Sequence, residues 1–239
     1  MRSLSVIIPA LNEAATLETT LSPLQPWRKA GHQLILVDGG SSDGTPSIAS
    51  PLVDRVLVST PGRARQMNLG AEVACGDLLL FLHADTRLPA EAERLLHRAL
   101  EQRRWGRFDV RLSGRHWLLR VVERMMNWRS CIGGIATGDQ GIFVERDLFG
   151  QVGGFPELPL MEDIVLSKRL KRAAGRPACI HTPLLTSSRR WERNGILRTI
   201  LLMWRLRLAF FLGVPADRLA RRYRFNTGAG ETGARSGGE

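Results

Sequence analysis

Val6-Ile7-Ile8-Pro9-Ala10-Leu11-Asn12-Glu13 joins a run of apolar residues to a polar pair near the start of this chain. The run Leu4–Pro9 has the length and continuity of a strand that is buried on both faces of a parallel sheet. Leucines then recur every three or four residues in the segment 12–30, which is helical spacing. We therefore predict a strand, a polar turn and a helix, the start of a βαβ unit.

The same alternation continues through the first half of the chain. Further apolar runs are Leu34–Asp38, Arg55–Ser59 and Asp77–Leu82, and helical patterns cover Gly44–Ser50, Ala64–Cys75 and Pro89–Arg103. Strands that alternate with helices predict an α/β fold with a mostly parallel central sheet flanked by helices.

After Arg104 the pattern is less regular. We expect strands at Phe108–Leu112, Gly141–Glu145 and Pro177–Ile180, and helices at Arg146–Val152 and Glu162–Ala174. Between residues 118 and 128 apolar residues recur at helical spacing, with Arg120, Glu123, Arg124 and Asn127 on the opposite side. This predicts an amphipathic helix whose apolar side covers the domain.

The basic charge of the chain is concentrated near its C-terminus. Of the net charge of +11, the stretch Arg189–Arg224 carries +8, because ten arginines there face only Glu192 and Asp217. So uneven a distribution argues against a uniform nucleic-acid coat, and we expect no nucleic-acid partner. We predict a catalytic domain at residues 1–188, a basic amphipathic helical segment at 189–225 and a disordered tail at 226–239.

The segment 196–212 is an apolar helix edged by arginines, and Pro215 ends it. Aromatic residues flanked by arginine suit the surface of a bilayer. The alternative is a helix packed on the domain with its arginines in water. No run is long and clean enough for a spanning helix. Cys75, Cys131 and Cys179 are odd in number and widely spaced, so we predict no disulfide framework and no zinc site. A cytoplasmic location, peripheral on the inner membrane face if the helix meets lipid, is the expectation.

Polar residues follow three of the predicted strands. Asn12 and Glu13 follow the first, Asp38 and a Gly-Gly-Ser-Ser loop end the second, and His83-Ala84-Asp85 follows the fourth. Ligands of open parallel sheets bind beyond these strand ends. Helix capping and turn formation are the alternative roles. The chain has neither the dinucleotide glycine motif after its first strand nor a Walker A sequence. A nucleotide held partly through a divalent cation fits these residues.

Four blocks in this order resemble family-2 glycosyltransferases of the GT-A fold, which is Rossmann-like. They are the quoted first block, Val37–Thr45, Gly62–Gly70, and Gly76-Asp77 with Phe81–Asp85. Gly153-Gly154-Phe155 with Met161-Glu162-Asp163, and Arg189-Arg190-Trp191, are similar to later blocks of that family. The resemblance runs from Ser5 to about Trp191. It is nearest to a small bacterial subfamily associated with radical-SAM proteins, for which no acceptor is implied.

The resemblance implies a role for each matching residue. Asp163 matches the base that deprotonates the acceptor, and Asp85 matches the metal ligand for Mn²⁺ or Mg²⁺. The implied substrate-binding residues are Pro9, Asn12, Glu13, Asp38, Arg63, Asn68, His83, Asp139, Gln140, Glu162, Arg189, Arg190 and Trp191. His83 stands where the family has the first aspartate of Asp-x-Asp. It is expected to bind ribose or metal, or simply to end a buried strand. His181 is a second candidate nitrogen ligand, or an ordinary surface histidine.

The leading interpretation is an inverting glycosyltransferase that uses a nucleotide-sugar donor and an unidentified acceptor, which is lipid-linked or apolar if the C-terminal helix meets a membrane. Two alternatives remain at this point. A sugar-phosphate nucleotidyltransferase has a related architecture but a basic glycine-rich loop after its first strand, where this chain has Pro9–Glu13. A non-enzymatic RNA- or membrane-binding protein is suggested only by the arginine cluster.

Overall fold

One mixed sheet organises the computed structural model, which describes residues 2–227. Its eight strands lie in the order β3-β2-β1-β4-β7-β6-β8-β5. Strands β1 to β4 pair in parallel, as do β6 and β8, whereas β7 and β5 run antiparallel to their neighbours. The predicted α/β class with a mostly parallel sheet is confirmed. The order reverses around β1, and this creates the switch point at which such sheets bind ligands.

The first half of the chain forms the parallel part of the sheet. Its elements are β1 (Leu4–Ala10), α1 (Ala14–Leu21), η1 (Ser22–Leu24), α2 (Gln25–Lys29), β2 (Gln33–Asp38), α3 (Thr45–Ala49), β3 (Arg55–Val58), α4 (Arg63–Glu72), β4 (Leu78–Phe81), β5 (Thr86–Arg87) and α5 (Ala92–Ala99). All residues of β1 are buried. Helix α4 approaches β1 closely at Gly70, where an added methyl group would lie 2.4 Å from Cγ2 of Ile7. The small residue is needed because the helix rests directly on the strand.

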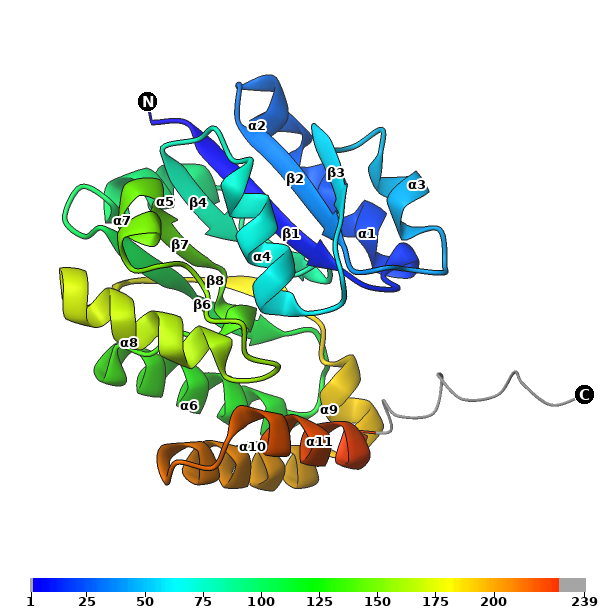
Figure 1. Cartoon of the computed structure of the whole chain (residues 1–239), viewed down its shortest axis with the longest axis vertical. Helices are drawn as coiled ribbons and strands as arrows, with labels where there is room; N and C mark the ends of the chain where they lie inside the picture. Colours follow the sequence, from blue (N-terminus) through cyan, green and yellow to red (C-terminus); the bar gives the residue numbers. More distant parts are fainter. Residues whose placement is uncertain (1, 228–239) are drawn as a thin grey trace, which may run out of the picture.

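The second half completes the sheet and adds a layer of helices below it (Figure 1). Its elements are β6 (Trp105–Leu112), α6 (Trp117–Gly133), η2 (Gly138–Gln140), β7 (Ile142–Glu145), α7 (Arg146–Gln151), α8 (Glu162–Ala174), β8 (Ala178–Thr186), α9 (Arg189–Asn194), α10 (Ile196–Phe211) and α11 (Ala216–Thr227). The short elements β5 and η2 were not expected from the sequence, whereas α9 lies within the predicted helical segment 189–225. Strand β8 is more than twice as long as the predicted run, because its pairing with β6 continues to Thr186.

The side of helix α6 that faces the sheet mixes apolar and polar residues, so the expectation that an apolar side covers the domain is only partly met. Strand β6 pairs with β7 only at Trp105 and Gly106, so the rest of that edge needs other partners. Asn127 supplies them by accepting from the Val110 amide at 2.8 Å and donating to the Val110 carbonyl at 3.0 Å. Glu123 accepts from the Leu112 amide. Unpaired backbone groups are costly to bury, so these polar side chains face inward.

This orientation leaves apolar side chains of α6 in solvent. The exposed side chains recur every three or four residues and are Trp117, Val121, Met125, Trp128 and Ile132. The opposite side of the helix still contributes Leu119 and Val122 to a buried cluster. We call the exposed set the α6 stripe.

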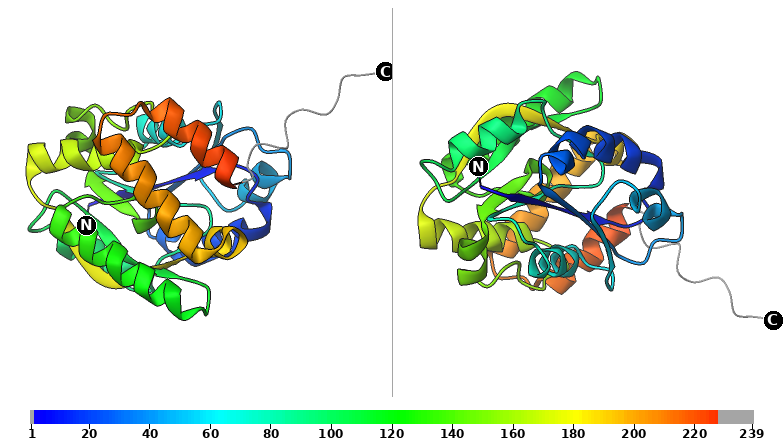
Figure 2. Two further views of the ribbon diagram at one scale, coloured as in Figure 1. Left: turned by 90° about the horizontal axis from the view of Figure 1, so that it is seen from below. Right: turned by 90° about the horizontal axis from the view of Figure 1, so that it is seen from above.

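The C-terminal helices pack on the domain and also expose apolar residues. Leu206 of α10 and Leu219 of α11 are buried against Met161 and Ile164 at the start of α8. The outer side of α10 exposes Leu197, Leu201, Trp204, Leu208, Phe211 and Leu212, which we call the α10 stripe. The interpretation that this helix packs on the domain is confirmed for its inner side. The membrane interpretation of its outer side stays a prediction. Seen from below, α6, α10 and α11 lie on the same side of the molecule (Figure 2).

Three further expectations concern single regions. The expectation of no disulfide is wrong for one pair, because Cys131 at the end of α6 is joined to Cys179 in β8, with Cα atoms 6.1 Å apart. Cys75 is free and exposed. No helix within residues 2–227 is long and apolar enough to cross a membrane. The predicted tail at 226–239 lies outside the described residues, except for its first two, which end α11.

Candidate active site

The loops after β1 and β2 hold each other through polar side chains. Asn12, at a φ of 55°, donates its amide to Oγ of Ser41 at 2.8 Å and accepts from the amide of Ser42 at 2.9 Å. Asp38 is buried and accepts from the amides of Gly40 and Ser41 and from the Ser41 hydroxyl. Both carboxylate oxygens of Asp38 are thus used within its own loop. The predicted contact of Asp38 with a nucleoside requires that this loop adjust around the ligand.

Two carboxylates from different strand ends meet one arginine. Nη2 of Arg189 lies 2.8 Å from Oε2 of Glu13 and 3.4 Å from Oδ2 of Asp85. Burial, and then the charge of Glu13, raise the pKa of Asp85, while Arg189 opposes this. Two carboxylates this close repel each other unless a positive charge lies between them. The site therefore favours a cation, and the guanidinium of α9 now lies in that position.

His83, two residues before Asp85 in the chain, presents a neutral nitrogen. Burial, followed by the charges of Arg63 and Arg190, lowers the pKa of His83 well below its ordinary value. Its Nε2 is buried and has no hydrogen-bond partner among the described side chains and backbone. A neutral imidazole is a suitable ligand for Mn²⁺, and its unpaired nitrogen fits a group that the protein itself does not supply.

Gly138 connects the strand-end carboxylates to a second acidic pair. An added methyl group at Gly138 would lie 2.9 Å from Nε2 of His83. The amide of Gly138 donates to Oδ2 of Asp163 at 2.9 Å, and the amide of Ile164 donates to Oδ1 at 2.7 Å. His83 and Asp163 therefore flank one short segment, η2, although 80 residues separate them in sequence.

Glu162 and Asp163 begin α8 as a pair of partly desolvated carboxylates. Burial, and then the charge of Asp163, raise the pKa of Glu162 to about 7. Burial also raises the pKa of Asp163, against the Gly138 amide and the charge of Arg207. The residue before them, Met161, has a φ of 70°, an uncommon conformation for a side chain of this size. Strained backbone and shifted pKa values together are typical of functional sites.

Some predicted site residues are engaged elsewhere in the structure. Pro9 is buried within β1 opposite Val37. The side chain of Asn68 donates to the Phe155 carbonyl at 2.8 Å and accepts from its amide at 2.9 Å, so it anchors the turn before α8. Gln140 is fully buried, and it bonds the Thr137 amide and the Ser130 hydroxyl. These residues support the backbone around the site, and their polar groups are already used in these contacts.

The remaining predicted residues surround the two acidic pairs. Arg63 begins α4 and is exposed, and its charge acts on His83, Asp85 and Glu162. Asp139 accepts from the Thr137 hydroxyl at 2.5 Å. In α9, the Arg190 guanidinium lies 5.5 Å from the ring centre of Tyr223, and Trp191 packs on the cluster beneath α6. Helix α9 therefore ties the C-terminal helices to the metal-binding candidates.

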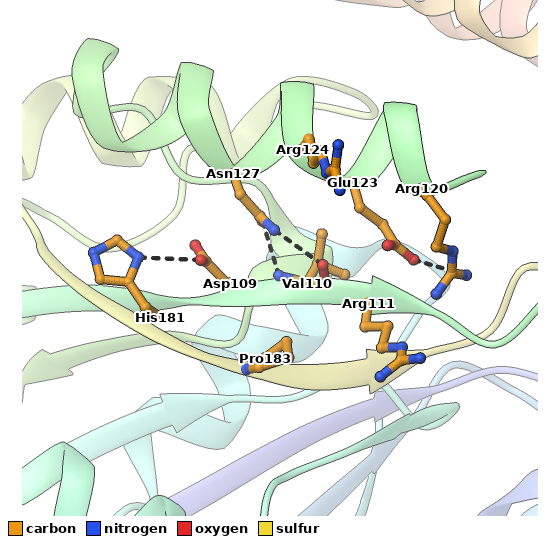
Figure 3. Close-up of a pocket in the computed structure, with 9 residues that line it drawn as sticks. All are labelled: Asp109, Val110, Arg111, Arg120, Glu123, Arg124, Asn127, His181 and Pro183. Atoms are coloured by element: carbon orange, nitrogen blue, oxygen red, sulfur yellow. Dashed lines mark hydrogen bonds and ion pairs between the residues drawn. The ribbon is translucent and has the colours of Figure 1, made fainter. Parts of the chain in front are cut away.

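A shallow pocket of about 300 Å³ lies elsewhere, between α6, β6 and β8 (Figure 3). Its lining includes Asp109, which bonds Nδ1 of His181 at 3.1 Å. His181 is exposed and is paired with Asp109 rather than with Asp85. The surface-histidine interpretation of His181 is the one that the structure favours. None of the predicted site residues except His181, offered only as a possible ligand, lines this pocket.

Another cluster of metal-ligand types lies at the start of β1 and β2. His32, Glu93 and His97 bring one ligand atom each within 4.8 Å of one another. The amide of Leu4 donates to Nδ1 of His32 at 3.3 Å, and Nε2 lies 2.9 Å from Glu93. This places the proton of a neutral His32 on Nε2, where it bonds Glu93. We interpret this cluster as a hydrogen-bonded one that braces the sheet.

Sequence reasoning missed two arginines near Asp163. Arg129 of α6 and Arg207 of α10 both act on the acidic residues of η2 and α8. Nη2 of Arg129 and Nε of Arg207 are buried without a hydrogen-bond partner. In the sequence, each of these arginines stands next to apolar residues of a predicted helix. Such a pattern is also typical of arginines that point into water, so it did not identify them as site residues.

The family model for glycosyl transferase family 2 matches residues 5–121, nearly half of the chain. This part contains Glu13, Asp38 and Asp85, while Asp163 and Arg189 lie beyond it. A PGL/p-HBAD biosynthesis glycosyltransferase from Mycobacterium tuberculosis is 33% identical over 168 residues, which cover 63% of this chain and 62% of the relative. The match therefore spans less than two thirds of that relative's length.

Solved structures share the fold at low sequence identity. Staphylococcus aureus TarS (residues 1–349) has a TM-score of 0.63 at 19% identity, covering 79% of this chain and 61% of TarS. A mannosyltransferase from Pyrobaculum calidifontis, in complex with GDP-Man and Mn²⁺, has a TM-score of 0.60 at 22% identity, covering 87% of this chain and 61% of that one. Residues 5–121 of this chain are therefore similar to glycosyl transferase family 2, and the chain shares the GT-A fold of the solved glycosyltransferases.

Proposed function

We propose that this chain transfers a sugar from a nucleoside-diphosphate sugar to an acceptor hydroxyl, with inversion at the anomeric carbon. The observation that carries the proposal is the presence of two separate acidic pairs around η2. Glu13 and Asp85 lie at the strand ends, and Glu162 and Asp163 lie at the start of α8. Inverting transfer needs a cation on the leaving group and a base on the acceptor, two tasks for separate carboxylates.

Asp163 is the proposed base. It takes the proton of the acceptor hydroxyl while that oxygen forms its bond to the anomeric carbon and the bond to the diphosphate oxygen breaks. The Gly138 and Ile164 amides hold its two oxygens in place, and the charge of Arg207 favours its ionised form. Glu162 lies beside it with a pKa of about 7 and is the alternative base.

Asp85 and His83 are the proposed ligands of a divalent cation. When bound, the cation neutralises the charge that grows on the diphosphate. The P. calidifontis mannosyltransferase was solved with Mn²⁺, which supports a cation of this kind here. Arg189 must then give up Asp85 and turn toward the diphosphate, for which a guanidinium is a good bidentate partner. Asn12, Asp38 and Arg63 form the proposed nucleoside side.

Donor hydrolysis provides the first test. Uridine-, guanosine- and thymidine-diphosphate sugars are incubated with the protein and Mn²⁺, and release of the nucleoside diphosphate is measured. We expect one donor to be hydrolysed, and hydrolysis to stop when the metal is chelated. Absence of binding and hydrolysis for all donors, with RNA retained on a filter instead, would overturn the proposal in favour of the RNA-binding alternative.

We further propose that the protein works on the cytoplasmic face of a membrane, where an apolar acceptor is presented. The α6 and α10 stripes expose aromatic and aliphatic side chains. The two helices that carry them lie on the same side of the molecule (Figure 2). The exposed Arg198 and Arg205 lie on α10 among them. Apolar side chains with flanking arginines bind anionic bilayers without spanning them.

A further inference from the structure

Two guanidinium groups near the proposed base have no partner of their own. Arg129 and Arg207 make no hydrogen bond or ion pair with the described side chains or backbone, and each has one nitrogen fully buried. Burial, and then the charge of Arg207, lower the pKa of Arg129 to about 10. Guanidinium has five donors, and burying it unpaired is unfavourable. Two such groups that repel each other therefore call for an anion between them.

These arginines lie close to the acceptor side of the site. The next charges that act on Arg129 are those of Asp139 and Asp163, and Arg207 acts in turn on Asp163. They come from two helices, α6 and α10, that contact each other directly. An anion bound there would lie on the same side of the site as the proposed base.

Exposed apolar residues neighbour both arginines in sequence. Trp128 precedes Arg129 on the α6 stripe, and Leu208 follows Arg207 on the α10 stripe. An acceptor that filled this place would have an anionic group between the arginines and an apolar part along the stripes. Arginine binds phosphate through paired donors, which makes a phosphate monoester the best match.

We propose that Arg129 and Arg207 form a phosphate subsite for the acceptor, which is an amphiphilic phosphate monoester. This inference rests on the proposed function and names its acceptor class. Two forms of the acceptor share this chemistry. In one, the arginines hold a phosphate near the reacting hydroxyl. In the other, the phosphate oxygen is itself the nucleophile, and no base is required because it is already ionised.

Binding of inorganic phosphate to the full-length protein, without metal or nucleotide, tests the subsite independently of transfer. We expect phosphate to raise the melting temperature above that in chloride of equal ionic strength. Arg129→Met and Arg207→Met should each abolish this rise. Arg124→Met and Arg205→Met, at exposed positions of the same helices, should retain it. An unchanged rise in the first two variants, or no rise in the wild type, overturns the proposal.

The melting temperature without phosphate separates a binding role from a structural one. Removing one of two unpaired guanidiniums should leave the melting temperature equal or higher, since methionine keeps the apolar stem. A lower value in both variants means that the arginines support the fold, and this also overturns the proposal. Donor hydrolysis in the wild type needs no acceptor phosphate, so its failure would count against the proposed function alone.

Acceptor assays then distinguish the two forms. A short-chain prenyl phosphate and the corresponding prenyl alcohol are compared as acceptors. If phosphate is the nucleophile, only the prenyl phosphate reacts, and Asp163→Asn retains most of the turnover. If a phosphate near a hydroxyl is held, a hydroxyalkyl phosphate reacts, its KM rises at least tenfold in Arg207→Met, and Asp163→Asn is inactive. Equal use of the phosphorylated and neutral acceptors by the wild type overturns the proposal.

Discussion

Arg189 donates from Nη2 to Oε2 of Glu13 at 2.8 Å, across 176 residues of sequence. The contact joins the first helix of the C-terminal segment to the loop after the first strand, and the same nitrogen reaches Asp85. One guanidinium thus holds Asp85, which we propose as a ligand of the divalent cation. Cation binding and this ion pair must therefore compete.

Metal binding should respond in opposite directions to two substitutions. Arg189→Ala removes the competing charge and should tighten Mn²⁺ binding in the absence of donor, whereas Asp85→Ala should abolish both Mn²⁺ binding and transfer. Arg193→Ala, at an exposed position of α9, is the control and should behave as the wild type. Free Mn²⁺ is measured by electron paramagnetic resonance. Near-normal metal-dependent turnover in Asp85→Ala would show that the metal lies elsewhere.

Loss of the base should affect turnover but not donor affinity. Asp163→Asn keeps the size of the side chain and removes its basicity, so we expect turnover of a hydroxyl acceptor to fall about 10²- to 10⁴-fold. The dissociation constant of the donor, measured by calorimetry, should change little. Glu162→Gln is the comparison. A larger loss there than in Asp163→Asn would transfer the role of base to Glu162.

Stability should fall as the pH rises toward neutrality, in part because of Glu162. Its pKa is about 7 in the folded protein and 4.5 as the reference for an unfolded chain, so folding favours the protonated form. The contribution is complete below about pH 4.5 and is lost as the pH rises through about 7. Glu162→Gln should flatten the dependence of melting temperature on pH in this range. A variant that keeps the wild-type slope would assign the dependence to other groups.

A methyl group at Gly138 should disturb His83. Gly138→Ala would place a carbon 2.9 Å from Nε2 of His83, which is closer than normal contact. We expect weaker Mn²⁺ or donor binding and a turnover reduced by at least tenfold, with the overall fold retained. Gly133→Ala has open space around its added methyl group and should be neutral. Wild-type turnover in Gly138→Ala would mean that this face of His83 is not used.

Membrane binding should depend on the exposed side of α10. We expect the protein to sediment with vesicles of phosphatidylglycerol and phosphatidylcholine at low salt and to be released at high salt. Leu208→Ser with Phe211→Ser should weaken binding without unfolding, because both side chains are exposed. Val58→Ser, at an equally exposed apolar position on β3, is the control. Equal sedimentation of the double variant and the wild type would exclude the α10 stripe as the contact.

The parallel half of the sheet could be predicted from the sequence because each strand there is a continuous apolar run. The runs that begin at Leu4 and Leu34 gave β1 and β2 almost residue by residue. Strand β5 was missed because it has two residues and exists only through its pairing with β8. The local sequence pattern cannot reveal a strand that is defined only by its pairing with a distant part of the chain.

The site was predicted less completely, since a motif identifies a residue but not its partners. Asn68 and Gln140 stand in the right blocks, yet backbone groups of the turn before α8 and of η2 use their amides. Arg129 could not be identified because it lies in none of the matching blocks. Arg129 is partly buried without a partner among the described residues of the packed structure, where α6 contacts α10. The spacing of residues in the sequence does not show which helices will pack together.

Asn127 and Glu123 of α6 bond backbone amides at the edge of β6, as a neighbouring strand would. Each residue advances an α-helix by about 100°. Deletion of a single residue before Asn127 would therefore turn the rest of α6, withdraw its amide from β6 and bury part of the α6 stripe. The same rotation of α6 about its axis points Asn127 at the strand edge and the α6 stripe at solvent. Neither can change by small insertions or deletions without the other, so this helix is expected to evolve by substitution alone.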